Sequence, residues 1–446
     1  MKLAISQFSP AADGITRDTQ KFQHALDLIS AHGGGTLYVD SGRYMLGGLL
    51  LGSNTCLHLE AGAELIVSDN YQDFAQARTH SSAECSDRAF LYALNVQNIT
   101  ISGSGKIFGS ADAYFSATPN EQGYRIPLEQ RPRIIVFEGC QNVQLREFSI
   151  EHAPMWTIHL VSCNNVKISE LTVQNDLTMA NTDALDIDSC QLVHITNSLF
   201  SAADDAICLK TTRKPEFLQQ PARQIVISNC TLQSKSCALK IGTETFADIE
   251  DVSVSNCAIY QSNRGIGIIS RDGGHLRRMQ FSHITFTCQT AHPCHWGKAD
   301  PLFVSVRHRD PAITPGKIEW ISFSHFTGIS EGAINLHSTP AGMVNHIRID
   351  HLQLEQRQTD SPEQGLYDVR PPCNPLRPTG MGLDNAYCLD PDTQRAFGVE
   401  SYPHGMPVIY AVGVKDLTLE QLSVQRPVPV PLPEGWNSEY IELVEG

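Results

Sequence analysis

Short stretches of alternating apolar and polar residues recur along most of the chain. Residues 156–160 (WTIHL) and 167–173 (KISELTV) are two of them. A period of about two residues is typical of a β-strand with one buried face. The stretches are short, small turns separate them, and no long helical pattern interrupts them between residues 90 and 356. The pattern therefore predicts a chain built mainly of short strands.

These strands belong to a degenerate repeat of about two dozen residues. Residues 137–143 (FEGCQNV), 160–166 (LVSCNNV) and 187–193 (IDSCQLV) carry its turn most clearly. The pattern returns at 224–232, 249–259, 276–286, 318–326 and 344–354. A coil of this size cannot bury its apolar face alone and must stack on its neighbours. We predict an all-β fold, a right-handed parallel β-helix, because a β-sandwich would not hold one period over so many residues.

The two ends of the chain differ from the repeat. Phe22, Ala25, Leu26 and Ile29 fall at helical spacing before the glycines at 33–35, which predicts a helix over residues 19–32 that caps the first coil. We expect one β-helix domain over residues 1–446. Its expected parts are the cap and first coils (1–70), repeated coils (90–356), a long loop rich in Pro, Gly and Asp (357–407), and final strands with a tail (408–446).

Composition and charge exclude some partners. The chain has 33 basic and 48 acidic side chains, a formal charge of −15, and 41% hydrophobic residues. Nucleic acids and anionic membranes require basic patches, so we expect neither as a partner. No stretch approaches the roughly 18 apolar residues of a membrane-spanning helix. An acidic saccharide stays possible, because a few Lys and Arg can reverse the field inside a cleft. The sequence gives no basis for an oligomeric state.

The N-terminus and the cysteines suggest a compartment. Residues 1–7 (MKLAISQ) do not resemble a secretory signal. Thirteen cysteines, mostly within strand-like patterns, are typical of reduced, packed thiols. We therefore expect a cytoplasmic protein, or a secreted one if a leader has been removed from this sequence.

Two carboxylate clusters lie about one coil apart, at 181–183 (NTD) and 203–205 (ADD). Neighbouring coils of a β-helix lie roughly 4.8 Å apart, so we expect Asp183 and Asp205 to be vertical neighbours with Asp204 beside them. Carboxylates held so close cannot all ionise easily, and one pKa should rise. An isolated Asp pair often marks a turn, but two such clusters in register, one coil apart, favour an acid–base site, which glycoside hydrolysis requires.

At these residues the chain resembles the polygalacturonase-type enzymes, glycoside hydrolase family 28. The motifs at 12–14 (ADG), 33–39 (GGGTLYV), 57–63 (LHLEAGA), 101–105 (ISGSG) and 131–133 (RPR) agree, and the resemblance covers about residues 10–290. It implies hydrolysis of galacturonate-containing glycans with inversion. Asp204 would be the general acid, Asp183 and Asp205 would hold and activate the water, and Asn181 would contact substrate. It implies no cofactor and no metal.

The chain also departs from the family pattern. Four successive coils begin at Asp183, Asp205, Cys237 and Arg264. Their third and fifth positions are aliphatic and should face inward, so the fourth and sixth should face the cleft. Cys237 stands where the family has a histidine. The family's Arg-Ile-Lys, which binds the uronate carboxylate, falls on 267–269 (GII).

Nearby cations are candidates to replace the missing pair. Lys240, Arg264 and Arg271 lie close in this register, and loss of Lys240 should weaken binding of an acidic substrate. Lys210 should also face the cleft, where it would lower the pKa values of Asp204 and Asp205 against their mutual repulsion. Which influence prevails stays open at this point. Cys237 fits a packed or cleft-lining thiol better than a nucleophile.

The loop segments add weaker candidates. Trp296 could stack on a sugar ring. The surrounding 292–298 (HPCHWGK) matches no tetrahedral zinc pattern, so we expect no metal there. Arg370 in the long loop could reach the cleft.

Three functions remain open from the sequence. The leading one is an inverting hydrolase that trims acidic oligosaccharides from one end, with residues 361–407 closing the cleft. The second is a uronate lyase or epimerase on the same fold. The third is a glycan-binding β-helix that has lost its activity.

Overall fold

The computed structural model describes residues 1–120, 123–292, 295–370, 391–392, 395–427 and 435–445. The chain forms a right-handed parallel β-helix, as predicted. Its residues group into two compact units, each made of two pieces of the chain. Unit 1 comprises Met1–Ala203 and Arg213–Ile225, and unit 2 comprises Asp204–Thr212 and Val226–Gly446. The expectation of one domain stays a prediction.

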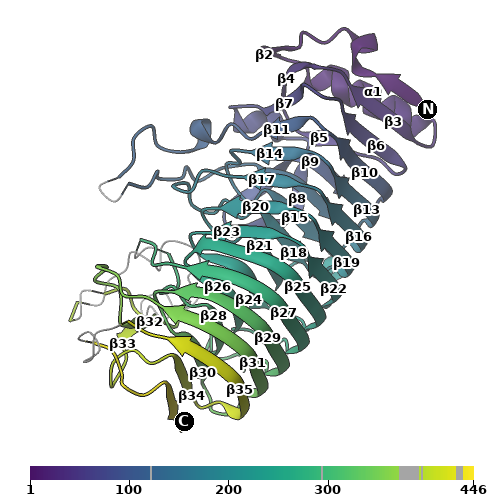
Figure 1. The fold of residues 1–446 in the computed structure, drawn as a ribbon. Helices are drawn as coiled ribbons and strands as arrows, with labels where there is room; N and C mark the ends of the chain where they lie inside the picture. Colours follow the sequence, from purple (N-terminus) through teal and green to yellow (C-terminus); the bar gives the residue numbers. More distant parts are fainter. Residues whose placement is uncertain (121–122, 293–294, 371–390, 393–394, 428–434, 446) are drawn as a thin grey trace. The chain divides into compact units, whose positions relative to one another are not determined.

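Unit 1 contains three parallel ladders, which Figure 1 shows side by side. Ladder A consists of β5 (Leu49–Leu50), β9 (Ser86–Leu94), β12 (Arg133–Glu138), β15 (Ile158–Val161) and β18 (Leu185–Asp188). Ladder B consists of β1 (Lys2–Ala4), β3 (Gly35–Val39), β6 (Thr55–Leu59), β10 (Gln97–Gly103), β13 (Gln141–Arg146), β16 (Asn164–Ser169) and β19 (Gln191–Thr196). Ladder C consists of β2 (Asp13–Arg17), β4 (Gly42–Leu46), β7 (Ala63–Val67), β11 (Lys106–Phe108), β14 (Ser149–Glu151), β17 (Thr172–Gln174) and β20 (Leu199–Ala202).

Unit 2 contains two long ladders. Its ladder A consists of β21 (Ile207–Thr211), β24 (Cys237–Thr245), β26 (Arg264–Ser270), β28 (Leu302–Val306), β30 (Ile334–Ser338), β34 (Ile409–Val412) and β36 (Ile441–Val444). Its ladder B consists of β23 (Thr231–Ser234), β25 (Ile249–Ser262), β27 (Leu276–Cys288), β29 (Ile318–Ser330), β31 (Val344–Gln356) and β35 (Lys415–Gln425). The strand β22 (Ala222–Ser228) contains residues of both units.

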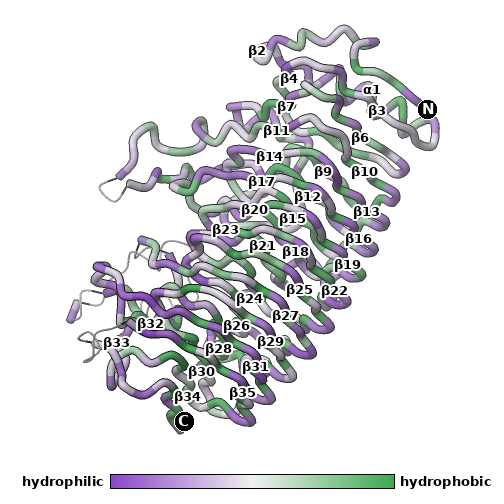
Figure 2. Tube along the Cα trace, viewed as in Figure 1, coloured by the Kyte–Doolittle hydropathy of each residue, from purple (hydrophilic) through white to green (hydrophobic). Residues whose placement is uncertain are grey.

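The period-two pattern produces the core directly. In unit 1, Val143, Val166 and Val193 pair in register and are fully buried, while the residues beside them point outward. Figure 2 shows the same alternation of hydrophobic and hydrophilic positions along the strands. Each coil covers the apolar face of the next one, and this burial is the main stabilising contribution to the fold.

The repeated turn motif has a backbone cause. Asn54, Asn98, Asn142 and Asn165 all have a positive φ of 55–59°, a region that Asn tolerates better than most residues. The side-chain amides of Asn98, Asn142 and Asn165 each donate to the side-chain oxygen of the preceding asparagine, at 2.6–2.8 Å. The Asn in the motif therefore makes the bend between strands and also links successive coils.

The predicted N-terminal helix is confirmed as α1 (Thr19–Ala31). Phe22, Ala25, Leu26 and Ile29 are its buried face. The amide of Gly34 donates to the carbonyl of Ile29, and Gly33 has a φ of 81° that ends the helix. The apolar face of α1 lies against β3 and β5, two strands of the first coils.

The long loop expected at 357–407 contains regular structure that the composition did not predict. The strands β32 (Leu366–Asp368) and β33 (Val399–Ser401) pair antiparallel within it. Residues 371–390 and 393–394 of this predicted loop lie outside the described residues. The final strand pair is confirmed as β34 and β35, and β36 adds one strand more.

The described cysteines are free thiols, most of them buried. Within the described ranges, no helix has the length and apolar character needed to cross a bilayer.

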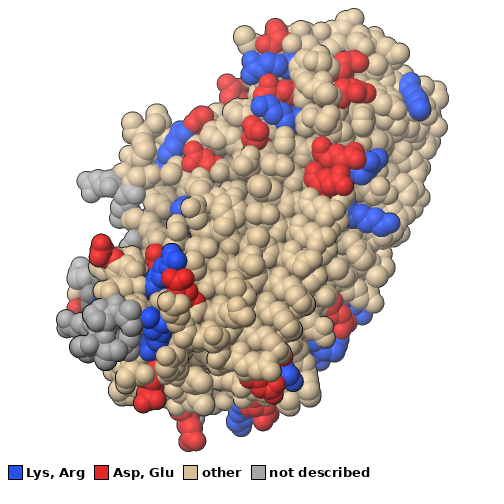
Figure 3. Space-filling model, viewed as in Figure 1, with Lys and Arg blue, Asp and Glu red and all other residues tan. Residues whose placement is uncertain are grey.

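On the face seen in Figure 3 most of the surface is uncharged, and acidic and basic side chains mostly lie beside one another. The ion pairs of the structure include Arg43 with Glu64, at 2.7 Å, and Arg277 with Glu250, at 2.9 Å.

Candidate active site

In unit 1, the segment before β18 fixes Asp183. Asn181 has a φ of 57°, and its side-chain oxygen accepts a hydrogen bond from Arg131 at 2.9 Å. The other terminal nitrogen of Arg131 donates to the carbonyls of Pro154 and Ala180, at 3.0 and 2.9 Å. The carbonyl of Asp183 accepts from the amide of Thr157 at 2.8 Å, and its side chain is buried. The turn that carries Asp183 is therefore held by main-chain and guanidinium contacts.

A buried charge network lies at the other end of β18. One oxygen of Asp188 lies 2.5 Å from the Lys214 ammonium, and the other lies 3.3 Å from His159 Nε2. His159 Nδ1 lies 2.6 Å from Arg133 Nη1. Burial alone would raise the pKa of Asp188, but the charges of Lys214 and His159 hold it well below its usual range. Asp188 is therefore an ionised structural carboxylate.

The register predicted for the coils is confirmed within unit 2. Cys208 pairs with Lys240 and Lys240 with Gly267, while Leu239 pairs with Ile266 and is buried. Cys237 pairs with Arg264. The amide of Ala206 donates to the carbonyl of Cys237 at 3.1 Å, which brings the Asp204–Asp205 turn beside β24. Asp183 lies in unit 1, so its grouping with Asp204 and Asp205 stays a prediction from the repeat.

Asp204 is the carboxyl group whose pKa is raised into the range useful for acid catalysis. Its side chain is partly exposed, and its carbonyl accepts from Ser234 Oγ at 2.6 Å. Burial and then the neighbouring charge of Asp205 raise the pKa of Asp204 to about 6, although Lys240 and Lys210 act in the opposite direction. The question left open by the sequence is therefore decided in favour of a raised pKa.

Asp205 is fully buried and forms an ion pair with Lys240, which is itself almost buried. Burial would lower the pKa of Lys240, but the charge of Asp205 raises it well above its ordinary value. Lys240 is therefore charged at neutral pH. Two adjacent aspartates thus lie in different surroundings, Asp204 with a raised pKa and Asp205 in an ion pair with Lys240.

Lys210 lies on β21, and its charge acts on a third acidic group, Glu244. Burial alone would raise the pKa of Glu244, but the charges of Lys210, Arg309 and Lys240 lower it. Lys210 is buried, and its charge also acts on Asp204. The sequence analysis did not single out Glu244, because an isolated Glu at a strand end carries no distinctive pattern.

Cys237 is buried, and its thiol donates to the carbonyl of Leu239 at 3.2 Å. Burial, and then the charge of Asp205, raise the pKa of Cys237 to about 12. The thiol is therefore protonated at neutral pH, which argues against a nucleophilic role. Gly267 lies directly against it: a Cβ there would meet Cys237 Sγ at 3.1 Å and Arg264 Cδ at 3.2 Å. The departures from the family pattern at 237 and 267 therefore lie against each other and against Arg264.

Arg264 and Arg271 are buried and contact the segment that follows β31. Arg264 pairs with Asp300 at 3.1 Å, lies 3.6 Å above the Phe303 ring, and donates to the carbonyl of Asp368. Arg271 donates to the carbonyl of Val369 at 3.2 Å and to that of Ser305 at 3.1 Å. Both side chains therefore hold the start of the long loop on ladder A of unit 2.

Trp296 and Arg370 lie at the same loop. The half-buried ring of Trp296 has its centre 5.9 Å from the Lys240 ammonium, and its carbonyl accepts from Asn263 at 3.1 Å. Arg370 is buried against Asp368 and donates to the carbonyl of His295. Of the predicted site residues in unit 2, Trp296 thus lies beside Lys240. Pro293 and Cys294 of the rejected zinc motif lie outside the described residues.

Two buried carboxylates, Asp300 and Asp368, are partners of these groups. Asp300 accepts from Lys298 N and Asn335 Nδ2 as well as from Arg264. Asp368 accepts from the amide of Gly297 at 2.8 Å. Burial alone would raise the pKa of Asp368, but the charge of Arg370 holds it well below its usual range. The sequence contains no periodic signal for these contacts, because they join a loop to distant strands.

Comparisons with known proteins identify the family of this chain. The profile of glycosyl hydrolases family 28 matches residues 55–293. A probable polygalacturonase from Vitis vinifera is 24% identical over 75% of this chain and 74% of its own length. An exo-poly-alpha-D-galacturonosidase from Dickeya chrysanthemi is 23% identical over 59% of this chain and 51% of its own length.

A solved structure with the same fold is a hyperthermoactive exopolygalacturonase from Thermotoga maritima, with a TM-score of 0.68 and 20% identity, covering 80% of this chain and 88% of the other. The matched segment of the family profile is more than half of the chain and contains the Asn-Thr-Asp and Asp-Asp motifs. This chain belongs to glycosyl hydrolases family 28 and is a glycoside hydrolase.

Proposed function

We propose that the enzyme hydrolyses glycosidic bonds in galacturonate-containing oligosaccharides, with inversion at the anomeric carbon. The raised pKa of Asp204 beside the ion-paired Asp205 is the observation that carries this proposal. Relatives named as polygalacturonase and exo-poly-alpha-D-galacturonosidase support the substrate class. The match is to a family of hydrolases, so neither a lyase or epimerase nor an inactive binding protein is favoured.

The proposed chemistry follows from the raised pKa of Asp204 and from the carboxyl groups beside it. Asp204 donates its proton to the glycosidic oxygen as the bond to the anomeric carbon breaks. A water molecule attacks that carbon from the opposite face, and its proton passes to Asp183 or Asp205. The positive charge that develops on the sugar ring is stabilised by the same carboxylates. One displacement of this kind inverts the configuration.

Recognition of an acidic sugar requires positive charge near these groups. Lys210 and Lys240 supply it, although Lys240 is already paired with Asp205. Trp296 offers a half-buried ring beside Lys240, and stacking on a ring is a common way to bind a sugar face. We assign Asn181 to substrate contact, and Cys237 to the cleft wall.

Action from one end of the chain is part of the proposal. Arg264 and Arg271 hold residues 368–369 in place, which anchors the loop that we expect to close the cleft. Relatives and a solved structure with exo-acting names support the same mode. A cytoplasmic location, which suits an enzyme trimming imported oligosaccharides, stays a prediction that cell fractionation would test.

The direct experiment uses the purified protein with oligogalacturonides, rhamnogalacturonan fragments and neutral oligosaccharides. Release of a saturated monosaccharide, absent with Asp204→Asn, is the expected result. NMR of the first product should show the inverted anomer. An unsaturated product that EDTA abolishes would instead indicate a lyase, and intact substrate with every acidic glycan would contradict the proposed substrate class.

The pH dependence of activity should follow Asp204. As a general acid it must be protonated, and a pKa of about 6 means that this form falls about tenfold per pH unit above pH 6. We expect kcat/KM to decline above pH 6 and to fall about 50-fold between pH 6 and 8. The measurement is kcat/KM from pH 4 to 8 at constant ionic strength. A flat profile up to pH 8 would rule out Asp204 as the titrating acid.

A further inference from the structure

The bend between β23 and β24 lies beside Asp204 in unit 2. It consists of Lys235 and Ser236, which follow Ser234 at the end of β23. Ser234 Oγ donates to the carbonyl of Asp204 at 2.6 Å, and Ser236 forms a hydrogen bond with the carboxyl group of Asp204. The backbone of Lys235 is therefore held between two residues that contact the proposed general acid.

The other side of this bend contacts the segment that carries Trp296. The amide of Asn263 donates to the carbonyl of Ser234 at 3.0 Å, and its side chain donates to the carbonyl of Trp296 at 3.1 Å. Burial lowers the pKa of His295 to about 3, and the charge of Lys235 is one of several that act in the same direction. The ammonium group of Lys235 thus lies close enough to this segment to act on it.

The buried basic side chains on ladder A of unit 2 and on its loops are already engaged. Five of them form ion pairs with carboxylates of the same unit: Lys240 with Asp205, Arg264 with Asp300, Lys298 with Glu363, Arg309 with Asp272 and Arg370 with Asp368. Withdrawing one of these cations to bind a ligand would leave a carboxylate without its partner, which is costly. Lys210 and Arg271 are buried too, and both interact with other groups of the protein.

Lys235 differs from these cations. Its side chain is half-buried, and within the described residues its ammonium group makes no ion pair and no hydrogen bond. A partly desolvated ammonium group binds an anion more strongly than a fully exposed one, because less water screens its charge. Arg307, which follows the end of β28, is also half-buried and has no ion pair among the described residues, but it lies two coils further along ladder A.

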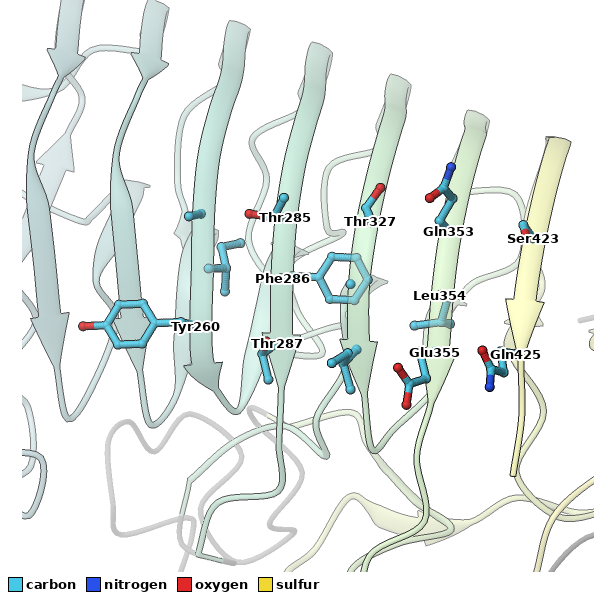
Figure 4. A pocket seen from close by; sticks show the side chains of 14 residues that line it. Tyr260, Thr285, Phe286, Thr287, Thr327, Gln353, Leu354, Glu355, Ser423 and Gln425 are labelled. Carbon is cyan, nitrogen blue, oxygen red and sulfur yellow. The ribbon is translucent and has the colours of Figure 1, made fainter. Parts of the chain in front are cut away.

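The outer face of ladder B has a pocket of a different character. It crosses β25, β27, β29, β31 and β35, and none of its described lining residues is Lys or Arg. Figure 4 shows hydroxyl and amide groups, such as those of Thr285, Thr327 and Gln353, along these strands. This pocket therefore gives an acidic sugar no cation to pair with, unlike the bend beside Asp204.

From these contacts we propose that the ammonium group of Lys235 binds the carboxylate of a galacturonate unit of the substrate. Galacturonate as the ligand follows from the proposed function, on which this assignment rests. A charge-assisted hydrogen bond at this bend would hold the sugar in a fixed orientation next to Asp204. It would also select units with a free carboxylate over methyl-esterified units, because the ester carries no charge.

The test measures binding of trigalacturonate and of its methyl ester by titration calorimetry, in an Asp204→Asn background that does not turn the ligand over. We expect Lys235→Met to weaken binding of trigalacturonate about tenfold or more and to remove the preference for the acid over the ester. Lys235→Arg should restore most of the affinity. The matched control is Lys317→Met, which removes an exposed lysine just before β29 and should bind like the parent protein.

Two further measurements separate binding from structure. In the active enzyme, Lys235→Met should raise KM for an oligogalacturonide about tenfold and change kcat less than about threefold. Its midpoint of urea denaturation should equal that of the wild type, because no ion pair within the described residues is lost.

Three results would overturn the assignment. They are unchanged binding of trigalacturonate in Lys235→Met, an equal loss of affinity for the acid and the ester, and a loss in Arg307→Met alone, which would place the carboxylate at the end of β28. The proposed function fails separately. If the wild type releases no sugar from oligogalacturonides but binds them through Lys235, hydrolysis of this substrate is wrong and the carboxylate site is supported.

Discussion

Asp204→Asn should reduce kcat by about 10³-fold or more while leaving substrate binding nearly unchanged. The amide keeps the shape of the carboxyl group but cannot donate its proton to the leaving oxygen, and general acid catalysis contributes about 10²–10⁴-fold. Single-turnover measurements on an oligogalacturonide would separate this loss from product release. An activated substrate, whose leaving group needs no proton, is the control and should recover much of the rate.

The same variant should be more stable at neutral pH. The pKa of Asp204 is about 6 in the folded state against an ordinary value of 3.8, so the folded state binds more protons between pH 4 and 6. Its carboxyl group therefore lowers stability progressively as the pH rises through that window, and the cost is constant above pH 6. We expect Asp204→Asn to raise the free energy of unfolding by about 1–2 kcal/mol at pH 7 and to leave it unchanged at pH 4.

A denaturant titration at both pH values measures this difference. Asp183→Asn, the same kind of substitution in the Asn-Thr-Asp motif, is the comparison. Equal stability of the wild type and Asp204→Asn at pH 7, together with full activity, would remove Asp204 from its proposed role. Loss of activity without a change in stability would keep the role but contradict the raised pKa.

Lys240→Met should destabilise the enzyme by about 3–5 kcal/mol, because it leaves the carboxylate of Asp205 buried without its partner. The sequence suggested that loss of Lys240 would mainly weaken substrate binding. The ion pair adds a cost in stability, since Lys240 is only 7% exposed. Urea denaturation at pH 7 gives the change in the free energy of unfolding.

A double variant separates the two effects. In Lys240→Met with Asp205→Leu, both members of the ion pair become apolar, and most of the lost stability should return, although activity should not. Arg278→Met is the matched control, because its pairs with Glu250 and Asp251 are exposed and should contribute less than about 1 kcal/mol. A loss below 1 kcal/mol for Lys240→Met would mean that the pair is effectively solvated.

The sequence was sufficient to predict those features of the fold that follow from its repeat. The register of Lys240 with Gly267, the inward direction of Leu239 and the helix over residues 19–31 all follow from spacing alone. The repeat constrains these features because a shift by one residue would turn every apolar side chain outward. The resemblance carried by the Asp motifs then gave the family, which the profile match confirmed.

Contacts between loops and strands could not be predicted from the sequence. Arg264 and Arg271 were expected as candidate cations for the substrate, but the structure shows both buried against residues 368–369. Such contacts join positions about 100 residues apart, and no period relates them. The pKa of Asp204 was equally undecided, because it depends on the balance of burial, Asp205 and two lysines rather than on residue type.

The order of synthesis constrains how unit 1 can fold. Its residues 213–225 come after the first strand of unit 2, and they supply Lys214 to Asp188 and the carbonyl of Leu218 to Ser162. A nascent chain that ends at residue 203 would bury Asp188 without its ammonium partner. Unit 1 therefore cannot complete its charge network on the ribosome until β21, the first strand of unit 2, has already been made.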